Sequence, residues 1–260
     1  NEPELFDKIH KFMLPGDFIA FKLTEEISTT KNGLSEGIFW DYKSNNIAEW
    51  LLDYFGFNLD LVPKLVDNFS PQGYITNKAS LETGLPEGIP ITYRAGDQPN
   101  NALSLNVFND GEVAATGGTS GVIYAVTNNK NSKESSRINH FAHVNYSDDN
   151  HTIGKLLCIN GAGIMYRWLR NQSSAESYET MNRQASKIPI GSNGLVILPF
   201  GNGAERMLNN TNIGTQFCNI NLNQHNKAHL FRAALEGIAF SFVYGMEILK
   251  NDNAKIKVIR

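Results

Sequence analysis

One segment of the sequence places a carboxylate among amides directly after a β-prone run. Ala95-Gly96-Asp97-Gln98-Pro99-Asn100-Asn101 follows the run Ile91 to Tyr93. A carboxylate held by neighbouring amides at the end of a strand is well placed to accept the proton of a substrate hydroxyl. The same residue types also form turns and cap helices, and the segment taken alone favours that structural interpretation. Asp97 is therefore a candidate general base with a structural alternative.

A glycine-rich turn follows, between two apolar β segments. Its sequence is Thr116-Gly117-Gly118-Thr119-Ser120-Gly121. Glycines permit positive φ angles, so successive backbone N–H groups can converge on one anion, and the two hydroxyls add further donors. An ordinary hairpin turn explains this glycine-rich sequence equally well. The segment is a candidate phosphate loop.

A third segment, Asn160-Gly161-Ala162-Gly163, opens a helix expected from Ile164 to Arg170. Glycine at a helix N-terminus leaves N–H groups and the positive end of the helix dipole available to an anion or a nucleotide. Close packing of the helix explains the glycines just as well.

The sequence does not match the motifs of several other kinds of site. After Gly118-Thr119-Ser120 the sequence continues Gly121-Val122, so the last glycine of a nucleophile elbow is missing. The chain has no P-loop lysine, and Gly201-Asn202-Gly203-Ala204-Glu205-Arg206 has arginine where a dinucleotide fingerprint needs its third glycine. Serine hydrolases, P-loop enzymes and Rossmann dehydrogenases are thereby excluded.

Two histidine pairs have a spacing that could bring their rings together. They are His140 with His143, and His225 with His229. Neither pair has a third ligand at a suggestive spacing, so surface or capping histidines are favoured over a metal site. We expect no protein-bound metal centre.

The elements that must position these residues alternate between helix and strand. Strands are expected at Ile91 to Tyr93, Glu112 to Thr116, Val122 to Val126 and Gly194 to Pro199, with a polar loop at Asp97 to Asn101, and helices at Ala48 to Phe55, Ala162 to Arg170, Tyr178 to Ser186 and Lys227 to Lys250. Towards the N-terminus, two short helices should break at Pro15-Gly16, with Asp17 as an N-cap. This alternation indicates an α/β protein.

Composition bounds the kind of protein and its partners. The 260 residues are 41% hydrophobic and carry a formal charge of −3, without a basic stripe, so a nucleic-acid partner is not expected. No apolar run approaches the length of a membrane span. Cys158 and Cys218 lie far apart and are expected to be buried thiols in a reducing, cytoplasmic compartment.

Taken together and in this order, the segments resemble the FGGY family of carbohydrate kinases, and among its members the bacterial kinases of xylulose. The resemblance lies in the stretch from Leu14 to Thr24, in Ala95-Gly96-Asp97-Gln98, in Gly118-Thr119-Ser120-Gly121 and in the signature from Phe217 to Glu236. It runs through essentially the whole chain. Glu25, Gln98, Thr215 and Asn219 depart from the usual family letters, but none of these changes removes a reacting group.

The resemblance implies an actin-like, RNase H-like fold of two domains with ATP and sugar in the cleft. Residues 1–90 would be the end of the N-terminal, sugar-binding domain and residues 91–260 most of the C-terminal, nucleotide-binding domain. Asp97 would be the catalytic base and Gln98 a sugar contact, while nucleotide and phosphates would be held by Gly117, Gly118, Thr119, Ser120, Gly163 and Arg167. ATP and Mg²⁺ are the implied cofactors, and a homodimer is compatible with the family.

The activity implied is phosphorylation of a ketose, with D-xylulose as the first candidate and ribulose, fuculose, glycerol or gluconate as other acceptors. A non-catalytic sugar- or nucleotide-binding module is the alternative, although a sensor has no need of a base. Because the chain starts at Asn1 and stops within the strand-like Lys255 to Arg260, we expect a piece of a longer protein. The first phosphate hairpin of the family would precede residue 1 and its adenosine loop would follow Arg260, so we expect no activity from the piece alone.

Overall fold

The structure, a computed structural model, describes residues 2–260 and divides them into two compact units. The first unit comprises residues 1–110, 128–130 and 140–154, of which residue 1 lies outside the described part. The second comprises residues 111–127, 131–139 and 155–260. Each unit has its own buried apolar cluster and is described by itself.

The first unit is built from short helices and two small two-stranded sheets. Its elements are α1 (Pro3–Phe6), α2 (Pro15–Thr24), β1 (Ser28–Thr30), α3 (Lys31–Glu36), β2 (Trp40–Asp41), β3 (Asn46–Ile47), α4 (Glu49–Phe55), the 3₁₀ turn Leu59–Leu61, β4 (Lys64–Val66), α5 (Asn77–Thr83) and α6 (Asp97–Ser104). Strand β1 pairs parallel with β4, and β2 pairs antiparallel with β3. Leu34, Trp40 and Leu52 belong to the buried cluster that joins these pieces.

Helix α4 ends as its sequence predicts, and helix α2 begins differently. Gly56 adopts the left-handed conformation that ends α4. The expected break at Pro15-Gly16 is instead the first turn of α2, where proline is tolerated because that turn needs no N–H donor. Asp17 is therefore not the N-cap. It lies in the first turn, where its carboxylate accepts the Leu14 N–H at 3.4 Å.

The segment around Asp97 also differs from the expectation. The polar residues expected in a loop form the first turn of α6, which starts at Asp97. The expected strand at Ile91 to Tyr93 is reduced to a single isolated bridge between Tyr93 and Phe69, although the Ile91 N–H donates to the Gly73 carbonyl at 2.9 Å and the Ile91 carbonyl accepts the Gln72 N–H at 2.8 Å. The segment around Asp97 belongs to the continuous stretch of the first unit that ends at Asp110.

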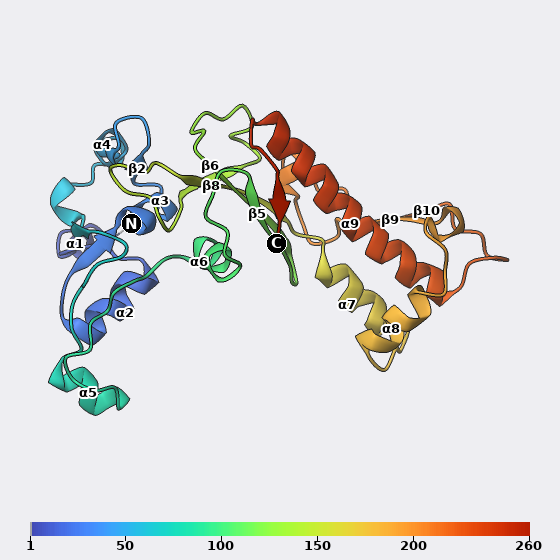
Figure 1. Cartoon of the computed structure of the whole chain (residues 1–260), viewed down its shortest axis with the longest axis horizontal. Coiled ribbons are helices and arrows are strands. Elements are labelled where there is room, and N and C mark those ends of the chain that lie inside the picture. Colours follow the sequence, from blue (N-terminus) through green and yellow to red (C-terminus); the bar gives the residue numbers. More distant parts are fainter. Residues whose placement is uncertain (1) are drawn as a thin grey trace. The chain divides into compact units, whose positions relative to one another are not determined.

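The second unit is organised on a mixed sheet. Its strands β5 (Glu112–Gly117), β6 (Gly121–Thr127), β8 (Ile153–Ile159) and β11 (Val258–Ile259) follow the order β11-β5-β6-β8, with β7 (Asn139–Ala142) next to β8. Strands β5 and β6 form an antiparallel hairpin in which Gly117 lies opposite Gly121. Strand β11 runs parallel to β5 (Figure 1). The predicted strands of this region are confirmed.

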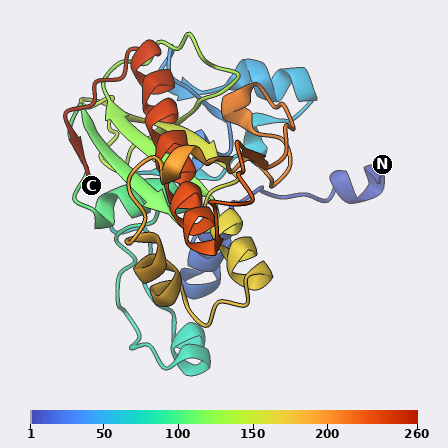
Figure 2. The same ribbon diagram turned by 90° about the vertical axis from the view of Figure 1, so that its right-hand side faces the viewer.

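Three helices, two 3₁₀ turns and the two strands of a second, smaller sheet complete this unit. They are α7 (Gly163–Gln172), α8 (Tyr178–Ala185), the 3₁₀ turns Ser192–Gly194 and Arg206–Leu208, β9 (Val196–Leu198), β10 (Gln216–Cys218) and α9 (Lys227–Asn251). Strands β9 and β10 pair antiparallel. The long helix α9 packs against α7, α8, β6 and β9, and Figure 2 shows it passing in front of the strands of the large sheet.

Small residues on α9 determine how closely it approaches its neighbours. A Cβ at Gly237 would lie 2.0 Å from the carbonyl oxygen of Ile197 in β9, so only glycine fits there. The N-terminus of α9 is capped by the Asn226 side chain, which accepts the Ala228 N–H at 3.0 Å. The predicted helix from Lys227 to Lys250 is confirmed.

A buried ion pair ties the end of α9 to strand β8. The Lys155 ammonium lies 2.7 Å from the Asp252 carboxylate, and both side chains are completely buried. Lys155 also donates to the carbonyl oxygens of Asn131 and Asp252, each at 2.8 Å. This arrangement satisfies the three donors of the ammonium group inside the unit.

Two composition-based expectations can be compared with the structure. Both cysteines are thiols without a disulfide in the described part of the chain, but they are partly exposed rather than buried. No helix among residues 2–260 combines the length and apolarity required to cross a bilayer.

Candidate functional site

Asp97 and Gln98 lie at the start of α6 in the first unit. The Asp97 side chain is exposed, and the Gln98 amide donates to its Oδ2 at 3.2 Å. A carboxylate in the first turn of a helix is favoured by the helix dipole and by the unpaired N–H groups of that turn. Asp97 is thus an accessible carboxylate held by an amide neighbour.

A second carboxylate lies directly beside this segment. Glu36, the last residue of α3, accepts the backbone N–H of Gly96, the residue before Asp97. Burial raises the pKa of Glu36 to about 7, with the Gly96 N–H opposing the shift and the negative charges of Asp97 and Asp17 adding to it. Sequence reasoning did not single out this residue.

Glu36 contributes to a pocket of about 330 Å³ in the first unit. An ion pair contributes to the wall of this pocket: the Arg94 guanidinium lies 3.0 Å from the Asp17 carboxylate. The Gly96 backbone and the start of α2 at Leu14 to Gly16 complete much of the lining. The pocket therefore carries both signs of charge next to the residue that precedes Asp97.

The predicted phosphate loop is the tip of the β5–β6 hairpin in the second unit. Gly118 donates its N–H to the Ser120 carbonyl at 3.0 Å, which closes the turn. None of its glycines has a positive φ, so the expectation that they serve the left-handed conformation is wrong. They provide space instead. A Cβ on Gly117 would meet nothing within 4 Å, whereas one on Gly121 would lie 2.7 Å from the Phe242 ring.

The N-terminus of α7 meets this hairpin through its backbone. Gly163 donates to the Gly118 carbonyl at 3.1 Å, and Ile164 donates to the Thr119 carbonyl at 2.9 Å. These two N–H groups are therefore not available to an anion, and of the two interpretations of this segment the structure favours close packing, because the helix docks onto the carbonyl side of the loop. A Cβ on Gly163 would lie 2.0 Å from the Gly118 oxygen, which explains the glycine.

Five of the six predicted nucleotide-side residues line one pocket of about 450 Å³ in the second unit. The five are Gly117, Gly118, Thr119, Gly163 and Arg167. Of these five, Thr119 and Arg167 bring polar side chains to the pocket. Ser120 is absent from the lining and instead accepts the Gly118 N–H through its carbonyl. Residues distant in sequence thus meet at one concavity.

The same pocket contains residues that sequence reasoning missed. Tyr166 and Tyr178 stack with ring centroids 5.8 Å apart, and the Tyr166 hydroxyl donates to the Asn182 side chain at 2.7 Å. Burial, followed by the neighbouring Tyr178, raises the pKa of Tyr166 to about 12. A signal existed, because Gly163, Tyr166 and Arg167 have the i, i+3, i+4 spacing of one helix face.

A buried carboxylate holds the loop that leads into α7. The two oxygens of Glu205 accept the N–H groups of Asn160 at 2.9 Å and Gly161 at 2.8 Å. Burial raises the pKa of Glu205, while the two N–H donors oppose the shift. Gly161 approaches the chain so closely that a Cβ would lie 2.0 Å from the Pro199 carbonyl oxygen.

The histidines do not form a metal centre in the described part of the chain, where no group of three or more His, Cys, Asp or Glu side chains could hold a metal ion. His229 interacts with the Asn226 side chain at the start of α9, and His225 with the Asn193 carbonyl, in keeping with the capping interpretation. His143 is buried instead, with Nε2 2.9 Å from the Val107 carbonyl oxygen.

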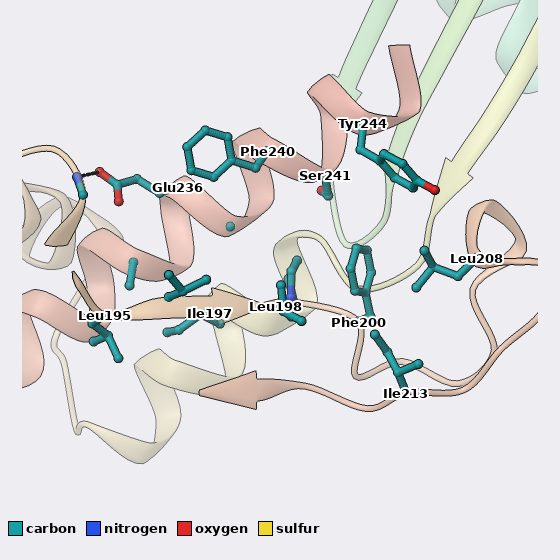
Figure 3. Close-up of a pocket in the computed structure, with 15 residues that line it drawn as sticks. Leu195, Ile197, Leu198, Phe200, Leu208, Ile213, Glu236, Phe240, Ser241 and Tyr244 are labelled. Carbon is teal, nitrogen blue, oxygen red and sulfur yellow. Dashed lines mark hydrogen bonds between the residues drawn. The ribbon is translucent and has the colours of Figure 1, made fainter. Parts of the chain in front are cut away.

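A further pocket of about 420 Å³ lies between α9 and strand β9 (Figure 3). Its walls are almost wholly apolar and include Phe200, Phe240 and Tyr244. Glu236 stands at one end, where its carboxylate accepts the Gly191 N–H at 3.0 Å. The lining contains none of the predicted site residues.

The fold and the arrangement of these segments define a carbohydrate kinase architecture, and family comparison agrees. Residues 1–104 match the N-terminal domain, and residues 113–260 the C-terminal domain, of the FGGY family of carbohydrate kinases. The chain belongs to the FGGY family. Both the predicted family and its α/β, actin-like ATPase fold are confirmed.

Individual relatives are similar at modest identity. The chain is 26% identical to a xylulose kinase of Bacillus subtilis over 260 residues, covering all of this chain and 51% of the relative. It is 28% identical to a gluconokinase of the same organism, covering 79% of this chain and 40% of the relative. A crystal structure of glycerol kinase with ADP from Plasmodium falciparum superposes with a TM-score of 0.89 at 21% identity, covering 100% of this chain and 52% of that one. The chain spans about half the length of the curated relatives it matches.

Proposed function

We propose that the protein containing this chain transfers the γ-phosphoryl group of ATP to a hydroxyl of a ketose, with D-xylulose as the first candidate substrate. The product would then be D-xylulose 5-phosphate. The observation that carries the proposal is the convergence of Gly117, Gly118, Thr119, Gly163 and Arg167 on one pocket of the second unit. The xylulose kinase among the relatives supports the choice of sugar, while the gluconokinase and the glycerol kinase keep other acceptors in the test.

The pocket of the second unit suits a nucleotide. Open space above Gly117 lets a phosphate approach the backbone without meeting a side chain. Arg167 is exposed at the same pocket and offers a cation, and the Tyr166–Tyr178 stack offers a flat aromatic surface for a base. Together these groups provide a place for phosphates, a counter-charge and a place for a ring.

In the proposed reaction Asp97 acts as the general base. Its carboxylate accepts the proton of the sugar hydroxyl while that oxygen forms a bond to the γ-phosphorus. The bond between this phosphorus and the β,γ-bridging oxygen breaks, ADP leaves, and the proton passes later from Asp97 to solvent. Gln98, which donates to Asp97 Oδ2, orients the carboxylate and is the proposed sugar contact. Mg²⁺ carried with the nucleotide supplies neutralisation of phosphate charge when bound.

The test is the variant Asp97→Asn in the full-length protein. Loss of a positioned base should lower turnover by ~10² to 10⁴, with a smaller effect on nucleotide affinity. Asp53→Asn is the matched control, because Asp53 is an exposed carboxylate on α4 in the same unit. Near-normal turnover of Asp97→Asn would remove Asp97 from this role.

The sugar is chosen by a substrate panel on the same protein. Release of ADP is measured with xylulose, ribulose, fuculose, glycerol and gluconate at equal concentrations. The proposal expects the highest kcat/KM with xylulose. A clear preference for another acceptor would keep the kinase and change its substrate, and ATP binding without turnover on any acceptor would favour a sensor.

A further inference from the structure

Glu36 makes an unusual contact with the segment that carries Asp97. Its carboxylate lies against the Cα of Gly96, so a Cβ at Gly96 would be 1.8 Å from Glu36 Oε2 and 1.9 Å from Oε1. The Gly96 N–H donates to the same carboxylate. Only glycine at position 96 allows this contact, and Gly96 is the residue that caps α6.

The surroundings of Glu36 are poor in compensating charge. Asp17 on α2 and Asp97 on α6 face it with the same sign, and Tyr42 and Tyr93 face it with hydroxyl groups. The nearby cation, Arg94, is paired with Asp17 and also donates to the Ser28 hydroxyl at 3.0 Å. Glu36 Oε1 is buried and has no hydrogen-bond partner among residues 2–260. Among these contacts, only the Gly96 N–H stabilises the ionised form of the Glu36 carboxylate.

We propose that Glu36 is a positioning residue for Asp97, because its carboxyl group holds the Gly96 amide and thereby fixes the first turn of α6 from which Asp97 projects. The inference rests on the proposed function, in which Asp97 is the base. Glu36 acts through the Gly96 backbone, while Asp97 contacts the substrate. Glu36 would thus orient the site without touching the substrate.

The chemistry of the contact predicts a dependence on pH. Burial raises the pKa of Glu36 to about 7, so the group is mostly neutral below that pH and carries a negative charge above it. Ionisation would place a charge beside Asp97 and strengthen the Gly96 hydrogen bond at the same time. The Gly96 amide and turnover should therefore both change over the same pH range.

Two variants of Glu36 separate the effect of its hydrogen bond to Gly96 from the effect of its ionisation. Glu36→Gln keeps an oxygen that can accept the Gly96 N–H but cannot ionise, whereas Glu36→Leu removes the acceptor. Glu82→Gln, on the exposed surface of α5, is the matched control. In the full-length protein we expect Glu36→Leu to lower kcat about 10-fold or more at every pH, with little change in KM for ATP. Glu36→Gln should restore most of kcat and lose the inflection of the pH profile near 7.

The contact between Glu36 and Gly96 can be tested by a measurement that does not depend on catalysis. In ¹⁵N-labelled protein, the Gly96 amide resonance should titrate with a midpoint near 7, and this titration should vanish in Glu36→Gln and persist in Glu82→Gln. A Gly96 amide that does not titrate in this range would overturn the contact. Unchanged kcat in Glu36→Leu, in a protein that turns over, would overturn the positioning role.

The two proposals fail in different ways. Wild-type protein that binds ATP but phosphorylates no acceptor contradicts the proposed function, and the amide titration still reports whether Glu36 holds the start of α6. Conversely, an active kinase whose Gly96 amide ignores Glu36 retains its function and loses this inference.

Discussion

The backbone N–H of Gly163 donates to the carbonyl oxygen of Gly118 at 3.1 Å, and the Cα of Gly163 leaves no room for a side chain against the same oxygen. The first turn of α7 and the tip of the β5–β6 hairpin are thus in direct backbone contact. A change at either glycine should reach the pocket that both residues line.

This contact gives a prediction in which stability and binding separate. Gly163→Ala places a Cβ 2.0 Å from the Gly118 oxygen, so the backbone must move; we expect a loss of about 1 to 3 kcal/mol in unfolding free energy together with weaker nucleotide binding. Gly117→Ala meets nothing within 4 Å and has no positive φ, so stability should hold while the new methyl group reduces nucleotide affinity. Urea unfolding and calorimetric titration with ATP measure the two effects. Equal stability of the two variants would contradict the close contact.

The buried pair of Lys155 and Asp252 gives a second prediction. Lys155→Met leaves the Asp252 carboxylate buried without its cation, which should cost about 3 to 5 kcal/mol. Adding Asp252→Asn removes the uncompensated charge and should recover part of the loss. Urea unfolding of the single and double variants gives the coupling. Lys187→Met, on an exposed lysine of the same unit, is the control and should change stability little.

The same pair predicts how the protein responds to acid. Burial by itself would raise the pKa of Asp252, but the hydrogen bonds from Lys155, Lys133 and Ser132 bring it below the ordinary value of 3.8. A lowered folded-state pKa means that this contribution to stability is complete above pH 3.8 and is lost as the pH falls through the folded-state value. The acid-induced loss of stability should therefore be smaller in the double variant than in the wild type.

Glu36 has the opposite sign of pH dependence. Its folded-state pKa of about 7 lies above the ordinary 4.5, so its stabilising contribution is complete below pH 4.5 and is lost as the pH rises through about 7. Glu36→Gln should consequently gain stability relative to the wild type between pH 5 and pH 8, by roughly 3 kcal/mol at most. Unfolding free energies at the two pH values measure the gain, and Glu82→Gln should show none. A difference between variant and wild type that is the same at both pH values would exclude the shifted pKa.

Local pattern was enough to predict much of the second unit. The hairpin, the helices α7 and α8 and the long α9 follow from apolar spacing and glycine turns, and the structure confirms them. The first unit is harder, because its strands contain only two or three residues each and the expected strand at Ile91 to Tyr93 depends on a single distant bridge. Segments that short carry almost no periodic signal.

The site shows the same division. The letters around Asp97 identified a carboxylate with an amide neighbour, but not that it begins a helix. Glu36 and Gly96 are far apart in the sequence, and only the folded chain shows that a carboxylate lies where the glycine has no side chain. Likewise, the glycines of the hairpin suggested unusual backbone angles, whereas the structure shows that they make room. Spacing along a chain predicts local geometry and says little about contacts of this kind.

Gly161, Gly163 and Gly237 each face a backbone oxygen at a distance that no side chain tolerates. Since peptide oxygens occur at every position whatever the side chain, no compensating substitution on the facing residue can relieve such a clash. These three positions should therefore vary little over evolutionary time even where the side chains around them diverge. They offer fixed reference points for aligning distant members of the family and for choosing where an engineer should leave the chain untouched.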